Sequence, residues 1–167
     1  IAGRDPDIIL ISEVIPKAQV LPIAPALLSI PGYSLFTSFN LGDSNLGRSG
    51  RRGLAAYIRD GISAAQVTIS VPALVEHLWL QIKLMGSDLL LVGCVYRSPS
   101  SDPNASVDEV VDLLHKVYSS GYTHILIAGD FNLPQIDWVQ NFCSAPDMHH
   151  AHKFLSAVQD CLLFQHV

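Results

Sequence analysis

The chain lacks the features that mark extracellular, membrane-spanning and zinc-stabilised proteins. Its 167 residues include only three cysteines, which are widely spaced and form no Cys-x-x-Cys motif. Such a pattern indicates reduced thiols in an intracellular protein, not a disulfide or zinc framework. No stretch approaches the roughly 18 consecutive apolar residues of a membrane span, and the first residues have neither a signal-peptide layout nor an initiating Met. We therefore expect an intracellular protein with no membrane partner, and an internal piece of a longer chain.

Charged residues are also scarce. They make up 15% of the chain, against 49% hydrophobic residues, and the net charge is -5. An acidic chain does not bind nucleic acid over its whole surface, so such binding requires a local basic patch. The length supports a single domain with a substantial core, over residues 1–167.

Hydrophobic patterns predict alternating strands and helices. Strands are expected at residues 8–11, 33–39, 54–58, 66–71, 78–84, 89–96 and 125–128, and helices at 107–117 and 151–162. A tight turn at 59–61 favours a hairpin between the third and fourth strands. Ser106 and Glu109 have the spacing of a capping box for the first helix. This helix joins two strands that the crossover rule predicts to be parallel. Residues 42–53 are rich in glycine and polar side chains and are expected to form a mobile surface loop.

The chemistry of the sequence is concentrated at residues 124–132. Ile125–Ala128 is a short apolar run typical of a strand buried on both faces, and Gly129 permits a close approach of the backbone. Asp130 and Asn132 follow at a spacing that puts two extended residues on one side. The stretch by itself is equally consistent with a cation or phosphate site and with a polar turn.

Two more apolar strands end in chemically capable residues, Glu13 after 8–11 and Tyr96 after 89–95. If these strands are near-parallel neighbours in one sheet, the side chains share the rim at which α/β proteins bind ligands. Two carboxylates with substrate oxygens are a usual way to hold Mg²⁺. Such an ion polarises a phosphodiester and stabilises its leaving oxygen.

Four motifs carry a family resemblance. They are Pro6-Asp-Ile-Ile-Leu-Ile-Ser-Glu13, Arg52-Gly-Leu-Ala-Ala-Tyr-Ile-Arg59, Val95-Tyr-Arg-Ser-Pro99 and Gly129-Asp-Phe-Asn132. Their order resembles that of the endonuclease/exonuclease/phosphatase superfamily. Residues 129–138 and 158–167 look most like its branch of non-LTR (LINE-type) retrotransposon endonucleases.

The resemblance implies a fold, a cofactor and a set of roles. The fold is a four-layered α/β sandwich, with two mixed sheets packed face to face, helices outside, and both ends incomplete. Glu13 matches the metal-ligating glutamate and Tyr96 the tyrosine that contacts the scissile phosphate. Asp130 matches the aspartate that orients or activates water, and Asn132 the phosphate-binding asparagine. The implied activity is Mg²⁺-dependent DNA nicking, with Mn²⁺ as an alternative ion, by a nuclear polyprotein that also carries a reverse transcriptase.

The sequence departs from the family pattern at both ends. The asparagine of the first strand and the closing Ser-Asp-His motif are missing from residues 1–167. Whether this piece is itself an enzyme is therefore left open. The alternatives are an inert remnant, a weak nucleic-acid-binding module, or a phosphodiesterase acting on phosphoinositide or sphingomyelin. No obligate protein partner is implied.

Basic side chains near the site offer phosphate contacts. Arg48, Arg51, Arg52 and Arg59 lie in one short window that contains no acid. Contact with DNA phosphates and a solvated hairpin are equally consistent with this window. Arg97, next to Tyr96, is the better phosphate candidate.

Other chemically capable side chains receive structural interpretations. His149, His150 and His152 are expected to be solvated on the polar face of the last helix. Trp138 is expected to be a packing anchor and Cys94 a core residue.

Overall fold

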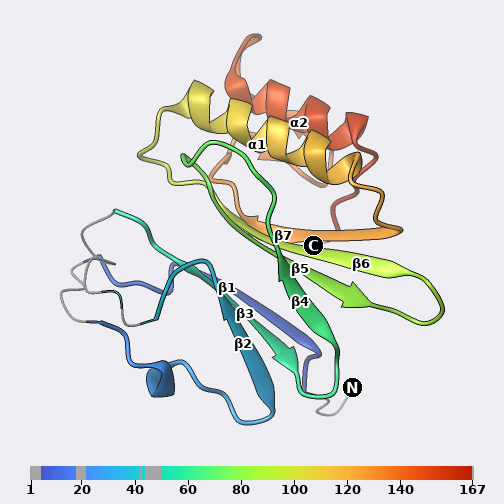
Figure 1. The fold of residues 1–167 in the computed structure, drawn as a ribbon. Helices are drawn as coiled ribbons and strands as arrows, with labels where there is room; N and C mark the ends of the chain where they lie inside the picture. The colour runs from blue at the N-terminus through green and yellow to red at the C-terminus, as the bar shows by residue number, and fades with distance from the viewer. Residues whose placement is uncertain (1–4, 18–21, 42, 44–49, 167) are drawn as a thin grey trace. The chain divides into compact units, whose positions relative to one another are not determined.

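The computed structural model describes residues 5–17, 22–41, 43 and 50–166 (Figure 1). Arg48 and most of the expected loop at 42–53 lie outside the described residues. The chain divides into two compact units. Unit 1 comprises residues 1–68, 76–96 and 123–130, and unit 2 comprises residues 69–75, 97–122 and 131–167.

Unit 1 contains an antiparallel sheet in which β3 is central. Its strands are β1 (Ile8–Ser12), β2 (Tyr33–Thr37) and β3 (Leu54–Arg59), in the order β1-β3-β2. Prolines between β1 and β2 limit helical structure among the described residues there to a 3-10 turn, η1 (Pro25–Leu27). The central strand is almost wholly buried, which explains its continuous apolar sequence.

The second sheet of unit 1 has four strands. They are β4 (Ala64–Val67), β5 (Glu76–Lys83), β6 (Leu89–Tyr96) and β7 (His124–Asp130), in the order β4-β5-β6-β7. The β5–β6 hairpin is antiparallel, and β6 and β7 are parallel. The parallel pair that the crossover rule predicts is therefore confirmed.

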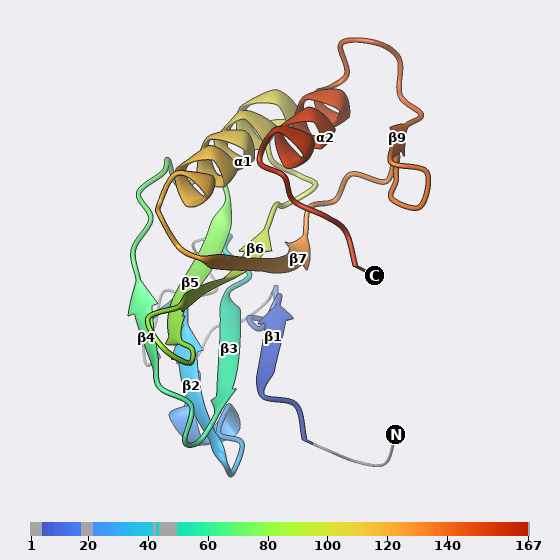
Figure 2. The ribbon, with the colours of Figure 1, turned by 90° about the vertical axis from the view of Figure 1, so that its right-hand side faces the viewer.

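The core of unit 1 lies between the two sheets (Figure 2). Alternating residues of the inner strands point into it, as the period of two in β5 and β6 requires. Its buried members are Leu54, Ala56, Ile58, Leu78, Leu80, Ile82, Val92, Cys94 and Tyr96. Cys94 is thus a core residue, and burial raises the pKa of its thiol to about 11. Packed sheets together with two helices confirm the α/β sandwich class.

Four details of the prediction are wrong. The strand at 124–130 is not buried on both faces, because β7 is the last strand of its sheet and Leu126 remains 44% exposed. The strand after the turn at 59–61 ends at Val67 and pairs with β5, not with β3. The described part of the first sheet is antiparallel, not mixed. Finally, β1 pairs within that sheet and is not hydrogen-bonded to β6 or β7.

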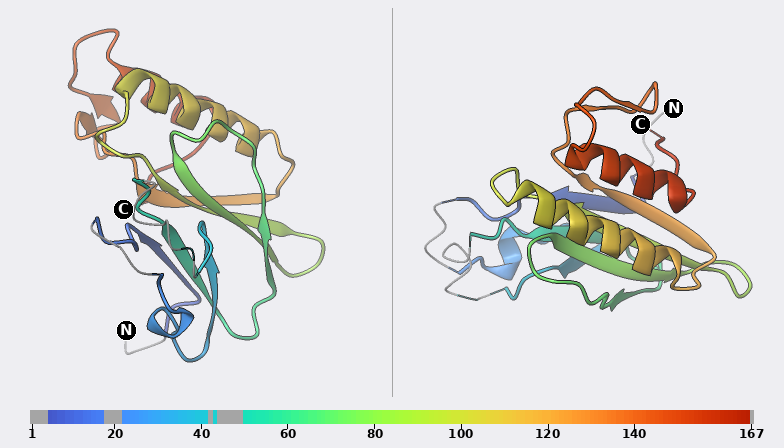
Figure 3. Two further views of the ribbon diagram at one scale, coloured as in Figure 1. Left: turned by 60° about the vertical axis from the view of Figure 1, so that its left-hand side comes forward. Right: turned by 90° about the horizontal axis from the view of Figure 1, so that it is seen from above.

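Unit 2 is built around two helices that pack against each other, α1 (Pro103–Tyr118) and α2 (His150–Asp160) (Figure 3). A two-stranded ladder, β8 (Ile136–Asp137) with β9 (Phe142–Cys143), precedes α2. Trp138 contacts Phe154 of α2 edge-on, as expected of a packing anchor. No helix among the described residues is long and apolar enough to cross a membrane.

The start of α1 differs from the predicted capping box. Asp102 caps the helix by accepting a hydrogen bond from the Ala105 amide, and Pro103 follows it in the first turn. Ser106 and Glu109 are instead buried inside the helix and bind other parts of unit 2. A sequence pattern cannot distinguish these arrangements, because Asp102 has a cap-competent side chain four residues upstream of Ser106.

Candidate active site

The predicted residues Glu13, Tyr96 and Asp130 meet in unit 1. The Tyr96 hydroxyl donates a hydrogen bond to Glu13 Oε1 at 2.7 Å, from the sheet opposite β1. Asp130 is the register partner of Tyr96 on the parallel strand β7. Their side chains therefore leave the sheet on the same face. The predicted arrangement along the rim of one sheet is wrong, because Glu13 follows a strand of the other sheet. The hydrogen bond nevertheless brings Glu13 and Tyr96 together.

Electrostatics favours an ionised Glu13. The hydrogen bond from Tyr96 is the main cause that lowers the pKa of this carboxyl, and the Arg52 guanidinium contributes, while partial burial opposes both. The side chain is 43% exposed, so solvent and ligands reach it. A negatively charged, accessible carboxylate is suited to a hard cation. Its backbone has a φ of 58°, an unusual conformation for a non-glycine residue.

Asp130 is positioned by the glycine before it. Gly129 has a φ of 154°, and a Cβ at this position would lie 1.8 Å from the Val95 carbonyl oxygen of β6. The backbones of β6 and β7 therefore approach as only glycine allows. The predicted close approach is confirmed, and the neighbour is the adjacent strand.

Two further side chains join this group of residues. Arg52 Nε lies 3.2 Å from Glu13 Oε1, so its predicted contact with DNA remains a prediction beside an observed ion pair. Glu76, which the sequence analysis did not select, accepts hydrogen bonds from the backbone amides of Arg52 and Gly53. The only sequence signal for Glu76 is a carboxylate at the first position of an alternating strand. Arg51 is exposed, and its contact with DNA also remains a prediction.

Arg97 and Asn132 form a separate cluster in unit 2. Arg97 is 3% exposed; its Nε donates to Ser106 Oγ at 3.0 Å and its Nη1 to the carbonyls of Phe131 and Asn132. Asn132 Nδ2 donates in return to the Arg97 carbonyl at 2.9 Å. These bonds hold Asn132 at a φ of 51°. Arg97 is thus part of the fold of unit 2, and its phosphate contact stays a prediction.

The three histidines are not simply solvated. His149 caps α2, its Nδ1 accepting from the Ala151 amide, and stacks on His150 with 3.9 Å between ring centroids. His152 Nε2 bonds the Ala145 carbonyl at 3.0 Å. All three are half-buried.

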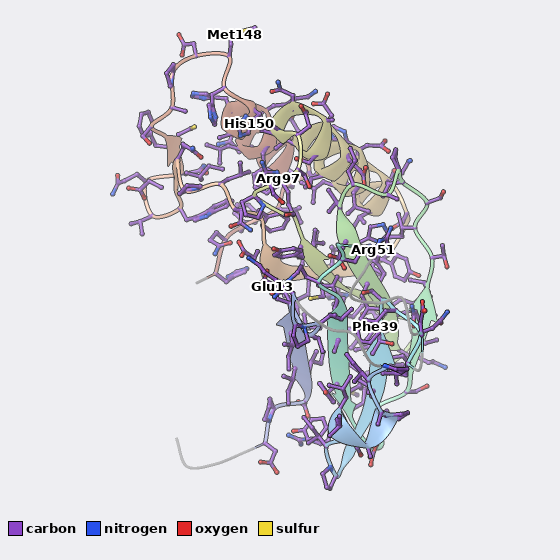
Figure 4. All side chains as sticks on the ribbon, turned by 90° about the vertical axis from the view of Figure 1, so that its left-hand side faces the viewer. Glu13, Phe39, Arg51, Arg97, Met148 and His150 are labelled. Atoms are coloured by element: carbon purple, nitrogen blue, oxygen red, sulfur yellow. The ribbon has the colours of Figure 1, made fainter. Side chains whose placement is uncertain are left out.

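His150 lies beside Arg97, whereas Met148 at the preceding turn is 98% exposed (Figure 4). Burial, with the charges of His149 and Arg97, lowers the pKa of His150. This shift favours the neutral form of His150.

The donor set suits Mg²⁺ better than a metal that needs an all-protein cage. Among the described residues, no three His, Cys, Asp or Glu side chains gather as a metal site. Mg²⁺, however, is commonly held by one or two carboxylates, with waters and substrate phosphates completing its shell. Glu13, an accessible carboxylate fixed by Tyr96, is suited to be such a ligand.

The sequence was compared with models of known protein families. Residues 1–156 match the model of the endonuclease/exonuclease/phosphatase family. The chain belongs to this family. A search of curated proteins finds no match.

Solved structures with the same fold are distant in sequence. A humanised TDP2 of D. rerio is 11% identical, with a TM-score of 0.51 over 96% of this chain and 58% of that one. The endonuclease domain of TRAS1, a telomere-specific non-LTR retrotransposon, is 14% identical, with a TM-score of 0.50 over 84% of this chain and 57% of that one. The chain thus spans slightly more than half the length of these two solved structures.

Proposed function

We propose that this chain is part of a Mg²⁺-dependent phosphodiesterase domain that nicks DNA. The observation that carries the proposal is the hydrogen bond between Tyr96 and Glu13, with Asp130 in register beside Tyr96. It brings together three residues from separate motifs of a family that includes endonucleases. Similarity of fold to a retrotransposon endonuclease supports a nucleic-acid substrate. For the parent protein we infer a reverse-transcriptase polyprotein that works in the nucleus.

Each residue has a specific task in this proposal. Glu13 would hold the ion, which would polarise the phosphodiester and stabilise the leaving oxygen. Asp130 orients the attacking water and accepts its proton as the phosphorus–oxygen bond breaks. Asn132 and Tyr96 hold phosphate oxygens, and Tyr96 also orients Glu13 in the structure. Arg51 and Arg52 contribute positive charge near the DNA backbone.

The direct test is nicking of supercoiled plasmid by the purified chain, with Mg²⁺ and with EDTA. Because positioned acid–base groups contribute about 10²–10⁴-fold, we expect Asp130→Asn to lower the nicking rate by that factor. Glu13→Gln is expected to abolish the nicking that depends on Mg²⁺. Asp112→Asn is the matched control, since Asp112 forms only a half-exposed ion pair with Lys116.

Three results would contradict the proposal. Equal nicking by the wild type, Glu13→Gln and Asp130→Asn would show that the activity does not come from this site. A folded wild-type chain that binds DNA without nicking it would favour the nucleic-acid-binding module. Hydrolysis of phosphoinositide or sphingomyelin vesicles, with plasmid left intact, would move the substrate to a lipid.

A further inference from the structure

The dipeptide Arg52–Gly53 is held by hydrogen bonds on two sides. On one side, Glu76 accepts from the Arg52 amide at 2.7 Å and, through its other oxygen, from the Gly53 amide at 2.8 Å. On the other side, the dipeptide carbonyls accept from the amides of Val14 and Ile15 at 3.2 and 2.7 Å. It therefore connects the first residue of β5 to the two residues that follow Glu13.

The same dipeptide also acts on Glu13 through its side chain. Arg52 Nε lies 3.2 Å from Glu13 Oε1, the oxygen that Tyr96 also binds. Gly53 has a φ of 69°, and a Cβ there would lie 2.7 Å from the Ile15 side chain. A larger residue at this position would require the Ile15 and Phe39 side chains to shift, so glycine allows the dipeptide to lie close to the segment after Glu13.

Glu13 needs this support because its own backbone conformation is unfavourable. A non-glycine residue at a φ of 58° is strained, and this conformation persists only where surrounding contacts enforce it. The contacts that enforce it here are the bonds from Val14 and Ile15 to the dipeptide. A carboxylate that accepts two backbone amides forms charge-assisted bonds, which are stronger than neutral ones. Glu76 is therefore the anchor of the arrangement.

We propose that Glu76 is a positioning residue for Glu13, acting through the Arg52–Gly53 dipeptide to hold the Glu13 carboxylate ready for a divalent cation. The inference rests on the proposed function, in which Glu13 is the metal ligand. Residues that orient a metal ligand typically contribute 10–100-fold to metal affinity. In this proposal Glu76 orients Glu13 and is not itself a metal ligand.

The test is direct metal binding, measured without catalysis. Mn²⁺ is titrated into the purified chain and the free ion is followed by electron paramagnetic resonance, with Mg²⁺ as competitor. We expect Glu13→Gln to abolish Mn²⁺ binding. We expect Glu76→Gln to raise the Mn²⁺ dissociation constant by about 10–100-fold. If Glu76→Gln does not fold, Glu76→Asp replaces it, with an expected loss of at least about threefold.

Glu109→Gln is the matched control. Glu109 accepts from the amides of Leu74 and Val75 at 3.1 and 2.9 Å, the same chemistry as Glu76, with all of these bonds inside unit 2. We expect the Glu109→Gln variant to be less stable than the wild type, while its Mn²⁺ affinity stays within twofold of the wild-type value (about 0.4 kcal/mol).

The outcomes separate the inference from the proposed function. If Glu13→Gln loses binding while Glu76→Gln retains wild-type affinity, the role of Glu76 is wrong and Glu13 remains the ligand. If Glu76→Gln and Glu109→Gln weaken Mn²⁺ binding equally, the inference is also overturned, because the effect would then reflect general destabilisation of the fold. If the wild type does not bind Mn²⁺, or Glu13→Gln binds it normally, the metal role of Glu13 fails and the inference fails with it.

Discussion

Replacement of Gly129 by alanine is the most informative perturbation of unit 1. The new Cβ would lie 1.8 Å from the Val95 carbonyl oxygen, where an ordinary contact is 3.4 Å or more. Neither atom is at the end of a flexible side chain, so β7 must move away from β6 by more than 1 Å (on the order of the missing contact distance). The glycine-only backbone conformation adds about 1–3 kcal/mol.

Movement of β7 also weakens the ladder at the Val95–Gly129 pair, where each hydrogen bond contributes about 1 kcal/mol. Together, these terms predict a loss of about 3–5 kcal/mol in the free energy of unfolding. That loss is a large share of the roughly 5–15 kcal/mol of a typical domain. Asp130, the next residue, would be displaced with the strand.

Urea unfolding of Gly129→Ala and Gly86→Ala measures this loss. Gly86 also has a positive φ, 71°, but a Cβ there meets nothing within 4 Å, so this control isolates backbone strain. We expect Gly86→Ala to lose about 1 kcal/mol. An equal loss in the two variants would refute the argument that the approach of β6 and β7 requires glycine. A surviving Gly129→Ala fold should also nick DNA more slowly, since Asp130 follows it directly.

Three further predictions concern other parts of the two units. Tyr96→Phe is expected to lower the free energy of unfolding by only about 0.5–1 kcal/mol near neutral pH, because Glu13 is partly exposed. This loss of stability should disappear as pH falls, because the Glu13 pKa is lowered in the folded state and the hydrogen bond stabilises the fold only while the carboxyl is ionised. Urea unfolding from pH 7 to pH 3 measures it. A loss that does not change with pH would contradict this account. Arg97→Met should lower the free energy of unfolding by about 2–4 kcal/mol, because the three acceptors of Arg97 would be left unpaired. Arg59→Met should lower it by less than about 1 kcal/mol, because its partner Asp7 is exposed. Thermal unfolding of the two variants compares them, and equal losses would show that the Arg97 bonds contribute little. The raised pKa of Cys94 predicts that stability falls as pH increases from about 9 towards about 11, by at most about 1.4 kcal/mol per pH unit, since only the unfolded thiol ionises in that window. Cys94→Val should remove this part of the slope in urea unfolding at pH 8 and pH 10.5, and an unchanged slope would assign it to other groups.

Local patterns were enough to predict most elements of the fold. The alternation along β5, the hairpin with β6 and the helical spacing of α1 are properties of short segments. The parallel pairing of β6 and β7 also followed, because a helix separates the two strands. The partners of β1 and β4 could not be predicted in this way, since antiparallel strands from distant segments pair according to which faces are buried together.

By itself, the sequence determined which residues belong to the candidate site. Glu13, Tyr96 and Asp130 were found because each ends an apolar strand and because their motifs stand in a family order. Gly129 was also identified as a point of close approach, since only glycine lacks a Cβ.

Only the tertiary structure decided how these residues are supported. It placed Glu13 in the sheet facing Tyr96, gave Glu76 two backbone amides to bind, and buried Arg97 among the acceptors of unit 2. Each of these interactions joins segments at least nine residues apart in the chain. Spacing and residue type carry no information about such contacts, because they form only when the packing of the core brings distant backbone together.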